Sequence, residues 1–555
     1  MPHRFSPTNL FSGTDVLTGS MMRGTAQRRG RAAGQVLAAG RALASCAALS
    51  LALCGCVGPN FVPPAAPAVD GYLSGKLASP TSPPGGPKVA NQHFISGQDV
   101  STRWWAAFQS EPLNHLIRDA VNHSPTLQSA EAAIMVAKYN ALAQRGLFFP
   151  QIGANYSPSI QQISGASSSG PGGQSPSVFS LHTAQVLVSF VPDVWGGNAR
   201  AVENLDALTE AQLFQLEAAY LTLTSNVVTA AITEASLRGQ IEATKRVIAI
   251  ERHLLDILNR QFDAGQAAKA DVLAQEAALA AAEQLLPPLE KQLAQQRDLL
   301  TALAGQLSSD EVAQKFDLAH LKLPTNLPIS LPSRLVDQRP DVRAAEANMH
   351  AASAEIGVAI AARLPNFTIS GNAGATAFSI SELFTPGTNF YALVGSATQP
   401  IFDGFTLYHK QKAAEAALDQ AEAQYRATVI TAFQNVADAL RALQADARAM
   451  QAAVHSEEAA KASLDIVERQ LNAGQVNQLA VLNAQQTYLT AVITHVQAEA
   501  NRLSDTAALF MALGGGWPAS CTSPVWRECA MGEVASERKE SELKSSEIKN
   551  PESRI

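Results

Sequence analysis

The sequence predicts a mainly α-helical protein with a small β part, organised as two versions of one helical hairpin. Three patterns support this prediction: a motif that occurs twice at the end of a long helical segment, apolar residues spaced by three and four, and stretches of alternating polarity next to prolines. The composition agrees, because alanine is abundant and only 6% of residues are aromatic, which suits long, closely packed helices.

The duplicated motif marks two predicted bends. Residues 260–266, Arg-Gln-Phe-Asp-Ala-Gly-Gln, return at residues 469–475 as Arg-Gln-Leu-Asn-Ala-Gly-Gln. Gly265 and Gly474 supply the left-handed backbone that ends a helix, so each copy predicts a turn between two antiparallel helices. The similarity extends in both directions as an internal two-fold repeat; the matching residues are Pro125 with Pro340, Glu131 with Glu346, Pro150 with Pro365, and Val272-Leu273 with Val481-Leu482.

Residues 1–55 have the layout of a signal peptide. Arginines precede an apolar stretch at residues 42–53, which is too short to span a bilayer comfortably. The stretch ends in Leu53-Cys54-Gly55-Cys56, which resembles a bacterial lipobox, so we predict cleavage before Cys56 and a covalent lipid on that cysteine. No cofactor is predicted beyond this lipid. The alternative is a cleaved signal in which the cysteine is incidental.

Residues 56–100 are rich in proline, serine and glycine and predict a lipid-anchored tether. Such a segment buries too little apolar area to offset the entropy of ordering, so we expect it to be extended, with order beginning near Trp104. Residues 518–555 mix both charges and predict a flexible C-terminal tail. In an oxidising compartment, Cys521 and Cys529 are candidates for a disulfide.

Four strands are predicted, each adjacent to a proline. Within each repeat, polarity alternates over two segments joined by a loop, so that apolar side chains share one face. The predicted strands are about 151–163 and 179–191 in the first repeat and about 366–377 and 389–399 in the second.

Long helices flank the strands in each repeat. We predict one helix before the strands, at about 113–149 and 334–363, and a longer one after them that runs without proline to the bend. Pro287-Pro288 should kink or locally break the return helix of the first repeat. The resulting segments are a first repeat at 101–306, a linker at 307–333 and a second repeat at 334–517.

Both long helices carry the seam of a coiled coil, and Glu234 interrupts the first one. At about 1.5 Å per residue, some 60 residues reach roughly 90 Å, which is far longer than a globular domain requires. The seam residues are Leu216, Tyr220, Leu223, Val227 and Ala230 in the first helix, and Val429, Phe433, Val436, Leu440 and Leu443 in the second.

The strands predict an assembly of several chains. No internal stretch reads as a transmembrane helix, yet the lipid signal and the alternating strands both indicate an outer membrane, where a closed barrel is the other permitted solution. Four strands do not close around a channel, and an open edge in lipid leaves amides unpaired. Several copies should therefore share one barrel.

Other classes of function have little support in the sequence. The net charge of −7 indicates no surface for nucleic acid. The histidines have no metal-ligand spacing, and there is no phosphate loop or nucleophile elbow, so we predict that the protein is not an enzyme. A lipid-anchored periplasmic coiled-coil scaffold without channel activity stays open as the alternative, although it has no use for alternating strands.

In their order and spacing, several motifs resemble those of the TolC-like outer membrane efflux proteins, in particular the OprM/NodT-type lipoprotein branch. The resemblance covers nearly the whole mature chain. Besides the two bends, it depends on Cys56-Val57-Gly58-Pro59-Asn60-Phe61, Pro192-Asp193-Val194-Trp195-Gly196, Gln338-Arg339-Pro340-Asp341-Val342, Ala345-Glu346 and Gln399-Pro400-Ile401-Phe402-Asp403-Gly404.

The resemblance implies a homotrimer in the outer membrane, lipid-anchored and extending into the periplasm. Each chain would contribute four strands to a shared 12-stranded transmembrane β-barrel and its helices to a long antiparallel coiled-coil helical barrel, with residues 307–333 in an equatorial collar. The implied function is the passive channel of a tripartite efflux system that exports small molecules, such as drugs or other toxic compounds. Its implied partners are a periplasmic adaptor protein, an inner membrane transporter and outer membrane lipid.

The resemblance also implies that the two bends form a periplasmic tip, where the tunnel closes and an adaptor docks. Relatives commonly carry Asp-Val-Leu-Asp-Ala after the second bend, whereas this chain has Ala480-Val481-Leu482-Asn483-Ala484 and lacks both carboxylates. We hypothesise that closure depends on apolar packing near Val481 and Leu482, with hydrogen bonding by Asn483. Asp271 has two interpretations: a gate residue, or a helix-start charge favoured by the helix dipole.

Overall fold

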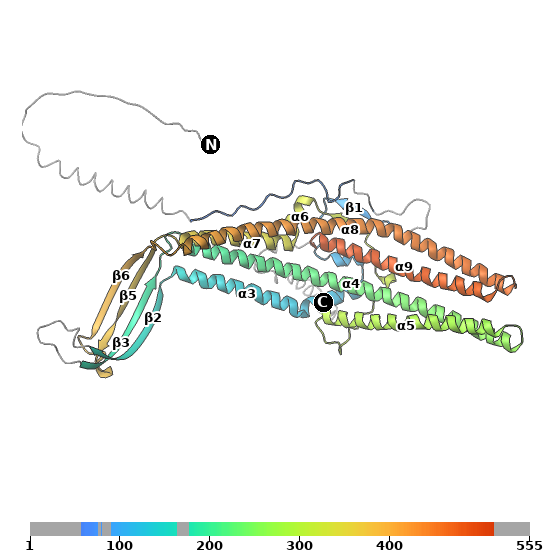
Figure 1. Ribbon diagram of the computed structural model, residues 1–555, viewed down its shortest axis with the longest axis horizontal. Coiled ribbons are helices and arrows are strands. Elements are labelled where there is room, and N and C mark those ends of the chain that lie inside the picture. The colour runs from blue at the N-terminus through green and yellow to red at the C-terminus, as the bar shows by residue number, and fades with distance from the viewer. Residues whose placement is uncertain (1–56, 76–78, 80–89, 164–176, 516–555) are drawn as a thin grey trace, which may run out of the picture. The chain divides into compact units, whose positions relative to one another are not determined.

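The computed structural model describes residues 57–75, 79, 90–163 and 177–515. The predicted signal peptide, Cys56, most of the loop between the first two long strands, and the C-terminal tail with Cys521 and Cys529 lie outside the described residues. Within the described part, helices predominate and four long strands form one sheet (Figure 1). No helix there combines the length and the apolar character needed to cross a membrane.

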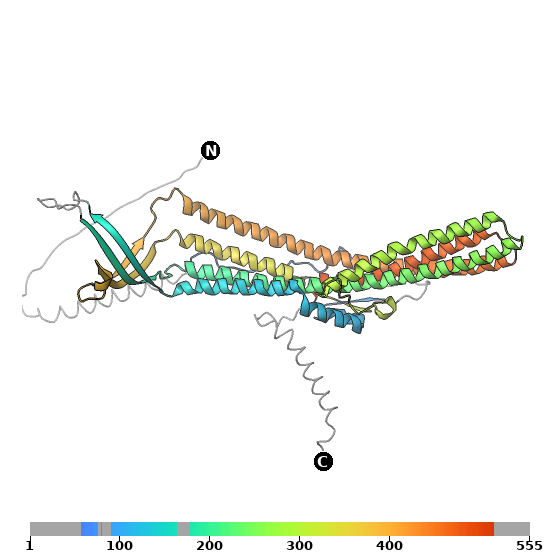
Figure 2. The same cartoon turned by 90° about the horizontal axis from the view of Figure 1, so that it is seen from below.

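Two helical hairpins form the longest part of the fold. Helices α4 (Gly197–Asp263) and α8 (Thr406–Asn472) have 67 residues each, and the return helices α5 (Lys269–Leu303) and α9 (Gln478–Ala512) have 35 each. α5 packs along α4 and α9 packs along α8, while α4 also contacts α9, so the two hairpins lie side by side (Figure 2). Their bends lie at the ends of α4 and α8 that are remote from the sheet (Figure 1).

Two shorter helices continue these hairpins toward the sheet. α3 (Pro125–Arg145) packs along α4, and α7 (Pro340–Ala361) packs between α4 and α8. The end of α5 meets the start of α3, because a Cβ atom at Gly305 would lie 2.5 Å from the carbonyl oxygen of His123. A Cβ atom at Gly514, after α9, would lie 3.2 Å from the carbonyl oxygen of Gln338, just before α7. α3 and α5 therefore stack end to end, as do α7 and α9.

The single helices predicted before the strands are wrong, because each is two helices. The additional helices are α2 (Glu111–His123) and α6 (Pro332–Gln338). The breaks fall at Ser124 and Arg339, whose backbones are extended, with ψ of 118° and 123°. Pro125 and Pro340 cause them, since proline disfavours helix in the residue before it and is well suited to begin the next helix.

The predicted local break of the return helix at Pro287-Pro288 is also wrong. α5 runs through both prolines without interruption. Both are exposed, as are Glu283 and Gln284, whose carbonyl groups lose their helical donors to the prolines. Since these residues are exposed, water can replace the lost donors, and the helix tolerates both prolines. A kink at this point stays a prediction.

One antiparallel sheet contains the long strands in the order β2, β3, β5, β6. Each strand begins and ends within two residues of its predicted limits, because the prolines and the alternation of polarity are local signals. Among the described residues, β2 and β6 each have one edge without a partner strand. The strands are β2 (Gln151–Ile163), β3 (Ser177–Phe190), β5 (Asn366–Ala377) and β6 (Asn389–Thr398).

A smaller sheet and an aromatic core surround the region where the stacked helices meet. β1 (His93–Ser96) pairs in parallel with β4 (Asn326–Ile329), which belongs to the predicted equatorial linker. Trp104, Phe108 and Phe510 are buried in one core with residues of α2, α4 and α8. The short 3-10 helices are η1 (Trp104–Phe108), η2 (Gly146–Phe148), η3 (Leu318–His320) and η4 (Ile380–Glu382).

Residues 57–75, which we call the strap, are extended as expected of the tether, but they are not loose. The hydroxyl of Tyr72 donates to the carbonyl oxygen of Ser330 at 2.9 Å, and its ring centre lies 5.6 Å from that of Phe433. The expectation that order begins near Trp104 is therefore wrong. A few aromatic side chains fix a segment whose average composition indicated none of these contacts.

Candidate gate at the paired hairpin tips

The same hydrogen-bonded bend ends α4 and α8. In the first, the amide of Gly265 donates to the carbonyl of Phe262 at 2.9 Å, and that of Gln266 donates to the carbonyl of Gln261 at 2.7 Å. The second bend repeats both bonds around Gly474, at 2.9 Å each. φ is 73° at Gly265 and 71° at Gly474, so both glycines adopt the left-handed backbone that the duplicated motif predicts.

The two return helices begin with different caps. In the first hairpin, Oδ2 of Asp271 accepts a hydrogen bond from the amide of Ala268 at 3.3 Å. In the second, Oδ1 of Asn477 accepts one from the amide of Ala480 at 3.2 Å. The bond made by Asp271 supports the helix-start interpretation of this residue, since it satisfies an amide that has no partner inside the helix. Its role in a gate stays a prediction.

The predicted gate residues differ in their access to the surface. Val272 and Val481, at matching positions after the bends, have no exposed surface. Ala480 and Leu482 are half-buried, and Asn483 is exposed. The side chain of Val481 is therefore enclosed within its own chain. Ala480, Leu482 and Asn483 keep access to the surface, and Leu482 and Asn483 have the larger side chains with which to contact another molecule.

A buried polar bridge, which the sequence analysis missed, joins the two hairpins near their bends. Nε2 of Gln275 in α5 donates to the carboxylate of Glu251 in α4 and, at 3.1 Å, to its backbone carbonyl. Oε1 of Gln275 accepts a hydrogen bond from Gln478 in α9 at 3.1 Å. Burial raises the pKa of Glu251, and the bond from Gln275 opposes this effect. Further along α9, Gln485 is 2% exposed, and its side-chain amide has no partner among the described residues.

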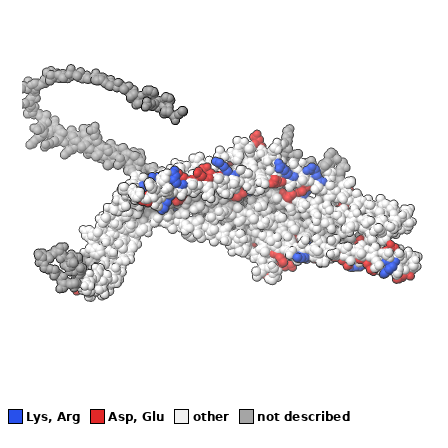
Figure 3. Space-filling model, in the orientation of Figure 1, with Lys and Arg blue, Asp and Glu red and all other residues white. Residues whose placement is uncertain are grey.

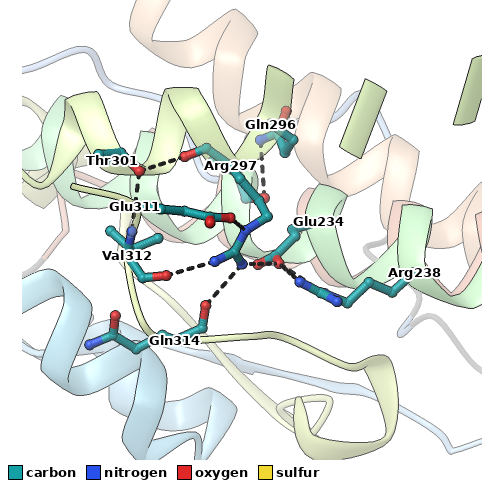
Figure 4. Close-up of polar contacts among 9 residues, drawn as sticks. Glu234, Arg238, Gln296, Arg297, Thr301, Glu311, Val312 and Gln314 are labelled. Carbon is teal, nitrogen blue, oxygen red and sulfur yellow. Dashed lines mark hydrogen bonds and ion pairs between the residues drawn. The ribbon is translucent and has the colours of Figure 1, made fainter. Parts of the chain in front are cut away.

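Arg297 of α5 fastens the equatorial linker to the first hairpin (Figure 4). Its Nη1 donates to Glu234 of α4 at 2.8 Å, its Nη2 donates to the carbonyl of Val312 at 2.6 Å, and its Nε pairs with Glu311. Glu234, which has no exposed surface, also accepts from Arg238 at 2.6 Å. The acid that interrupts the predicted seam is thus paired with two arginines.

The long sheet is a second candidate surface because it carries no formal charge. None of its four strands contains Asp, Glu, Lys or Arg, and the charged side chains visible in Figure 3 gather on the helical part. Ile152 lies opposite Val188 and Gly371 lies opposite Leu393, on a face that is mainly apolar. The other face is polar and includes a 3.2 Å hydrogen bond from Asn372 to Gln185.

Comparisons with known proteins identify relatives of this architecture. The model of the outer membrane efflux protein family matches residues 116–306 and 331–515. The chain is 27% identical to the pyoverdine export outer membrane protein OpmQ of Pseudomonas putida KT2440, over 75% of this chain and 88% of that protein. It is 28% identical to the outer membrane protein OprJ of Pseudomonas aeruginosa PAO1, over 85% and 94%. The structure of the outer-membrane channel OprN, 24% identical, has the same fold, with a TM-score of 0.73 over 83% of this chain and 100% of that one.

Proposed function

The chain belongs to the outer membrane efflux protein family, and on that premise we propose that three copies form one passive exit duct from the periplasm to the exterior. Membership makes the chain an outer membrane component of an efflux system. The trimer, the closed barrel, the lipid anchor and the gate are our proposals, and the sheet supports them most directly.

The uncharged sheet, whose two outer strands each have an edge without a partner in the described part of the chain, is the observation that carries the proposal. Its apolar face suits lipid and its polar face suits a water-filled lumen. The unpaired edges of β2 and β6 are costly in hydrocarbon unless other copies pair with them. Because the four strands alternate in direction, β6 of one copy can pair antiparallel with β2 of the next. Three copies then close a 12-stranded barrel.

We also propose that the two halves are an internal duplication. Equal lengths of α4 and α8, equal lengths of α5 and α9, and the shared bend support this. Each half contributes one helical hairpin and two long strands. In a trimer, six related hairpins would line a periplasmic helical barrel, and their bends would form its tip.

We also propose a lipid anchor and two partner proteins. A lipid on Cys56, just before the strap, would hold the chain at the outer membrane. The tip would dock a periplasmic adaptor protein, and an inner membrane transporter would supply the energy, since nothing in a passive duct does so. OpmQ is named for the export of pyoverdine. For this chain we propose small molecules, such as drugs or other toxic compounds, as cargo.

We propose that the gate closes through Leu482 and Asn483, because these predicted gate residues have access to the surface while Val481 does not. Without the usual carboxylates, a ring of three Leu482 side chains would exclude water, and Asn483 would add neutral hydrogen bonds. The bridge from Glu251 through Gln275 to Gln478 supports a closed arrangement of the two hairpins. The side-chain amides of Gln275 and Gln478 in this bridge restrain α9 relative to α4.

Conductance of the purified protein in planar bilayers tests the duct. We expect discrete conductance steps and trimers after chemical cross-linking. Leu393→Lys should prevent insertion, since a lysine on the lipid face costs about 2–4 kcal/mol near the bilayer centre. Ala392→Lys, one residue away on the polar face, should insert and change ion selectivity. A stable monomer without conductance would favour the scaffold alternative.

The same recording tests the gate. Leu482→Ala should increase the conductance of the closed state, and Asn483→Asp should change it little. A strong new cation block in Asn483→Asp, combined with intact closure in Leu482→Ala, would contradict the apolar gate while leaving the duct itself unaffected.

A further inference from the structure

The start of the strap carries a motif that the duct does not explain. Val57-Gly58-Pro59-Asn60-Phe61 follows the predicted lipid site directly, and it lies against the ends of α4 and α7 that are next to the long sheet. Five residues from both halves of the chain contact it or support those that do. We call these residues the cradle: Trp195, Arg200, Glu203, His350 and Gly357.

The backbone of the motif is held by hydrogen bonds that would be unavailable to a loose tether. The amide of Val57 donates to the carbonyl of Trp195 at 3.2 Å. Nε of Arg200 donates to the carbonyl of Val57 at 3.3 Å, and its Nη2 donates to Oδ1 of Asn60 at 2.7 Å. Arg200 is only 4% exposed, so its charge is committed to the motif and to the adjacent acid.

Two glycines face each other across this contact. Gly58 has φ of +103°, and a Cβ atom there would lie 2.6 Å from the Cα atom of Gly357 in α7. A Cβ atom at Gly357 would in turn lie 2.7 Å from the carbonyl oxygen of Val57. Any larger residue at either position would push the strap away from α7. Glycine is therefore required on both the motif and the cradle.

The far end of the motif is fixed by a stacked ring. Phe61 lies parallel to His350, with 4.5 Å between ring centres and 12° between planes. Nε2 of His350 lies 3.0 Å from Oε1 of Glu203, whose Oε2 accepts from Arg200 at 2.7 Å. Burial acts to raise the pKa of Glu203, but the bonds from His350 and Arg200 outweigh it and hold the pKa below its usual value. Glu203 thus links the two ends of the cradle.

The cradle lies where the helices meet the long sheet. The indole nitrogen of Trp195 donates to the carbonyl of Pro365, the residue before β5, at 2.8 Å. Consecutive Cα atoms are only about 3.8 Å apart, so a group joined to the docked amide of Val57 would be held close to this junction. Without the docked motif, Tyr72 would be the first fixed residue, and the extended chain before it could carry the N-terminus about 50 Å away from Tyr72.

We propose that the cradle is a docking site for the Val57–Phe61 motif, which fixes the N-terminus at the junction of helices and sheet and ties the two halves of the chain together there. The consequence for the membrane rests on the proposed lipid on Cys56. With the motif docked, the acyl chains would enter the bilayer beside the sheet, at the end of the sheet where its strands join the helices.

The test measures the mobility of the strap in the full chain. A nitroxide label is attached at Val62→Cys, which follows the motif and is 78% exposed, in a background with Cys521→Ser and Cys529→Ser. Gly58→Ala should increase the mobile fraction of the label by about tenfold, because it adds a clash and an unfavourable φ. Gly71→Ala is the matched control in the same strap, since a Cβ atom at Gly71 meets nothing within 4 Å, and the label should stay immobile.

The docking proposal is overturned if Gly58→Ala leaves the label immobile, or if Gly71→Ala mobilises it equally. If Gly58→Ala fails to fold, the same measurement is made with Phe61→Ala, which removes only the stacked ring. A mobile label in that variant supports docking, and an immobile label overturns it. Mass spectrometry of the N-terminal peptide tests the lipid separately. If Cys56 proves unlipidated, the anchor is refuted, and the label is then read in a background with Cys56→Ser so that it reports Val62→Cys alone; an immobile label there would leave the cradle standing.

Discussion

The two 67-residue helices have the same length and the same final bend, but very different surroundings. α4 packs against α2, α3, α5, α7 and α9, whereas α8 packs mainly against α7 and α9. Side chains are buried along nearly the whole of α4, while α8 exposes apolar residues such as Ile430, which is 68% exposed. Two helices of equal length that end in the same motif can thus have different neighbours.

The interiors of the two hairpins differ in polarity at matching positions. Glu234 in α4 and Arg297 in α5 form the buried ion pair of the first hairpin. Counted from the helix starts, the same positions in the second hairpin hold Leu443 and Thr506, neither of which is exposed. The residues of the polar bridge differ in the same way, since Glu251 and Gln275 of the first hairpin correspond to Ala460 and Ala484 of the second. At these positions the first hairpin therefore binds the linker and its neighbour through charged and amide groups, and the second holds smaller or apolar side chains.

Removing the arginine of the first hairpin should have the largest effect. Arg297→Met leaves Glu234 buried with Arg238 as its remaining partner. We expect a loss of about 3 kcal/mol, the lower end of the range for breaking a buried pair, and a lower thermal midpoint of the helical circular dichroism signal. The linker around Val312 should also become more sensitive to protease, because it loses its hydrogen bond to Arg297.

The matched control copies the second hairpin into the first. Glu234→Leu combined with Arg297→Thr removes both charges of the pair and should recover part of the lost stability, since neither charge is left buried without its partner. A double variant as unstable as Arg297→Met would show that the linker contacts of Arg297, and not the unpaired acid, determine the cost.

A second prediction uses the difference in burial between the two long helices. Glu217 of α4 is 4% exposed, and burial raises its pKa to about 8, although Arg343 opposes the shift; the matching residue of α8, Arg426, lies on the surface. The unfolded carboxyl ionises near 4.5, whereas the folded one keeps its proton to about pH 8. The folded state therefore binds more protons in this window, and its stability falls as pH rises from about 4.5 to 8.

Glu217→Gln removes this pH dependence, because an amide has no proton to lose in this range. The stability of the variant relative to wild type should be about 1–3 kcal/mol greater at pH 8 than at pH 5, a range that includes the cost of a buried amide without a partner. Thermal midpoints of wild type and Glu217→Gln between pH 5 and pH 8 measure this difference in stability. Arg426→Gln, at the exposed matching position, should leave the profile unchanged. Parallel profiles for wild type and Glu217→Gln would mean that this carboxyl is already ionised at pH 5.

The smallest effect is expected where α4 and α8 begin. Gly196 and Phe405 precede these helices with left-handed backbones, φ 74° and 66°. Gly196→Ala should cost about 1 kcal/mol, because a side chain is strained in this conformation. Phe405→Gly should relieve a similar strain, partly offset by loss of the ring contact with Phe402. Thermal midpoints that fall in both variants would indicate that Phe405 is held by a contact outside its own chain.

Local features of the fold and of the candidate site were predictable, because each depends on a few adjacent residues. Gly265 and Gly474 indicated the bends, and alternating polarity beside prolines indicated four strands. The polar bridge was not predictable in the same way. Gln275 looks like any polar residue of an exposed helix until α9 covers it. The interruption of the seam by Glu234 was visible, but only one of its two arginine partners, Arg238, is close in sequence, and the other, Arg297, lies 63 residues away.

Residue order alone therefore predicted an internal repeat, the positions of bends and strands, and the resemblance to a family of efflux proteins. These follow from backbone preferences and periodicity, which act over a few residues. Packing decided which helix became central, which glutamates lost their contact with water, and where the strap is held. Such outcomes depend on contacts between residues hundreds of positions apart, such as Gly58 with Gly357, whose energies arise only when the chain has folded.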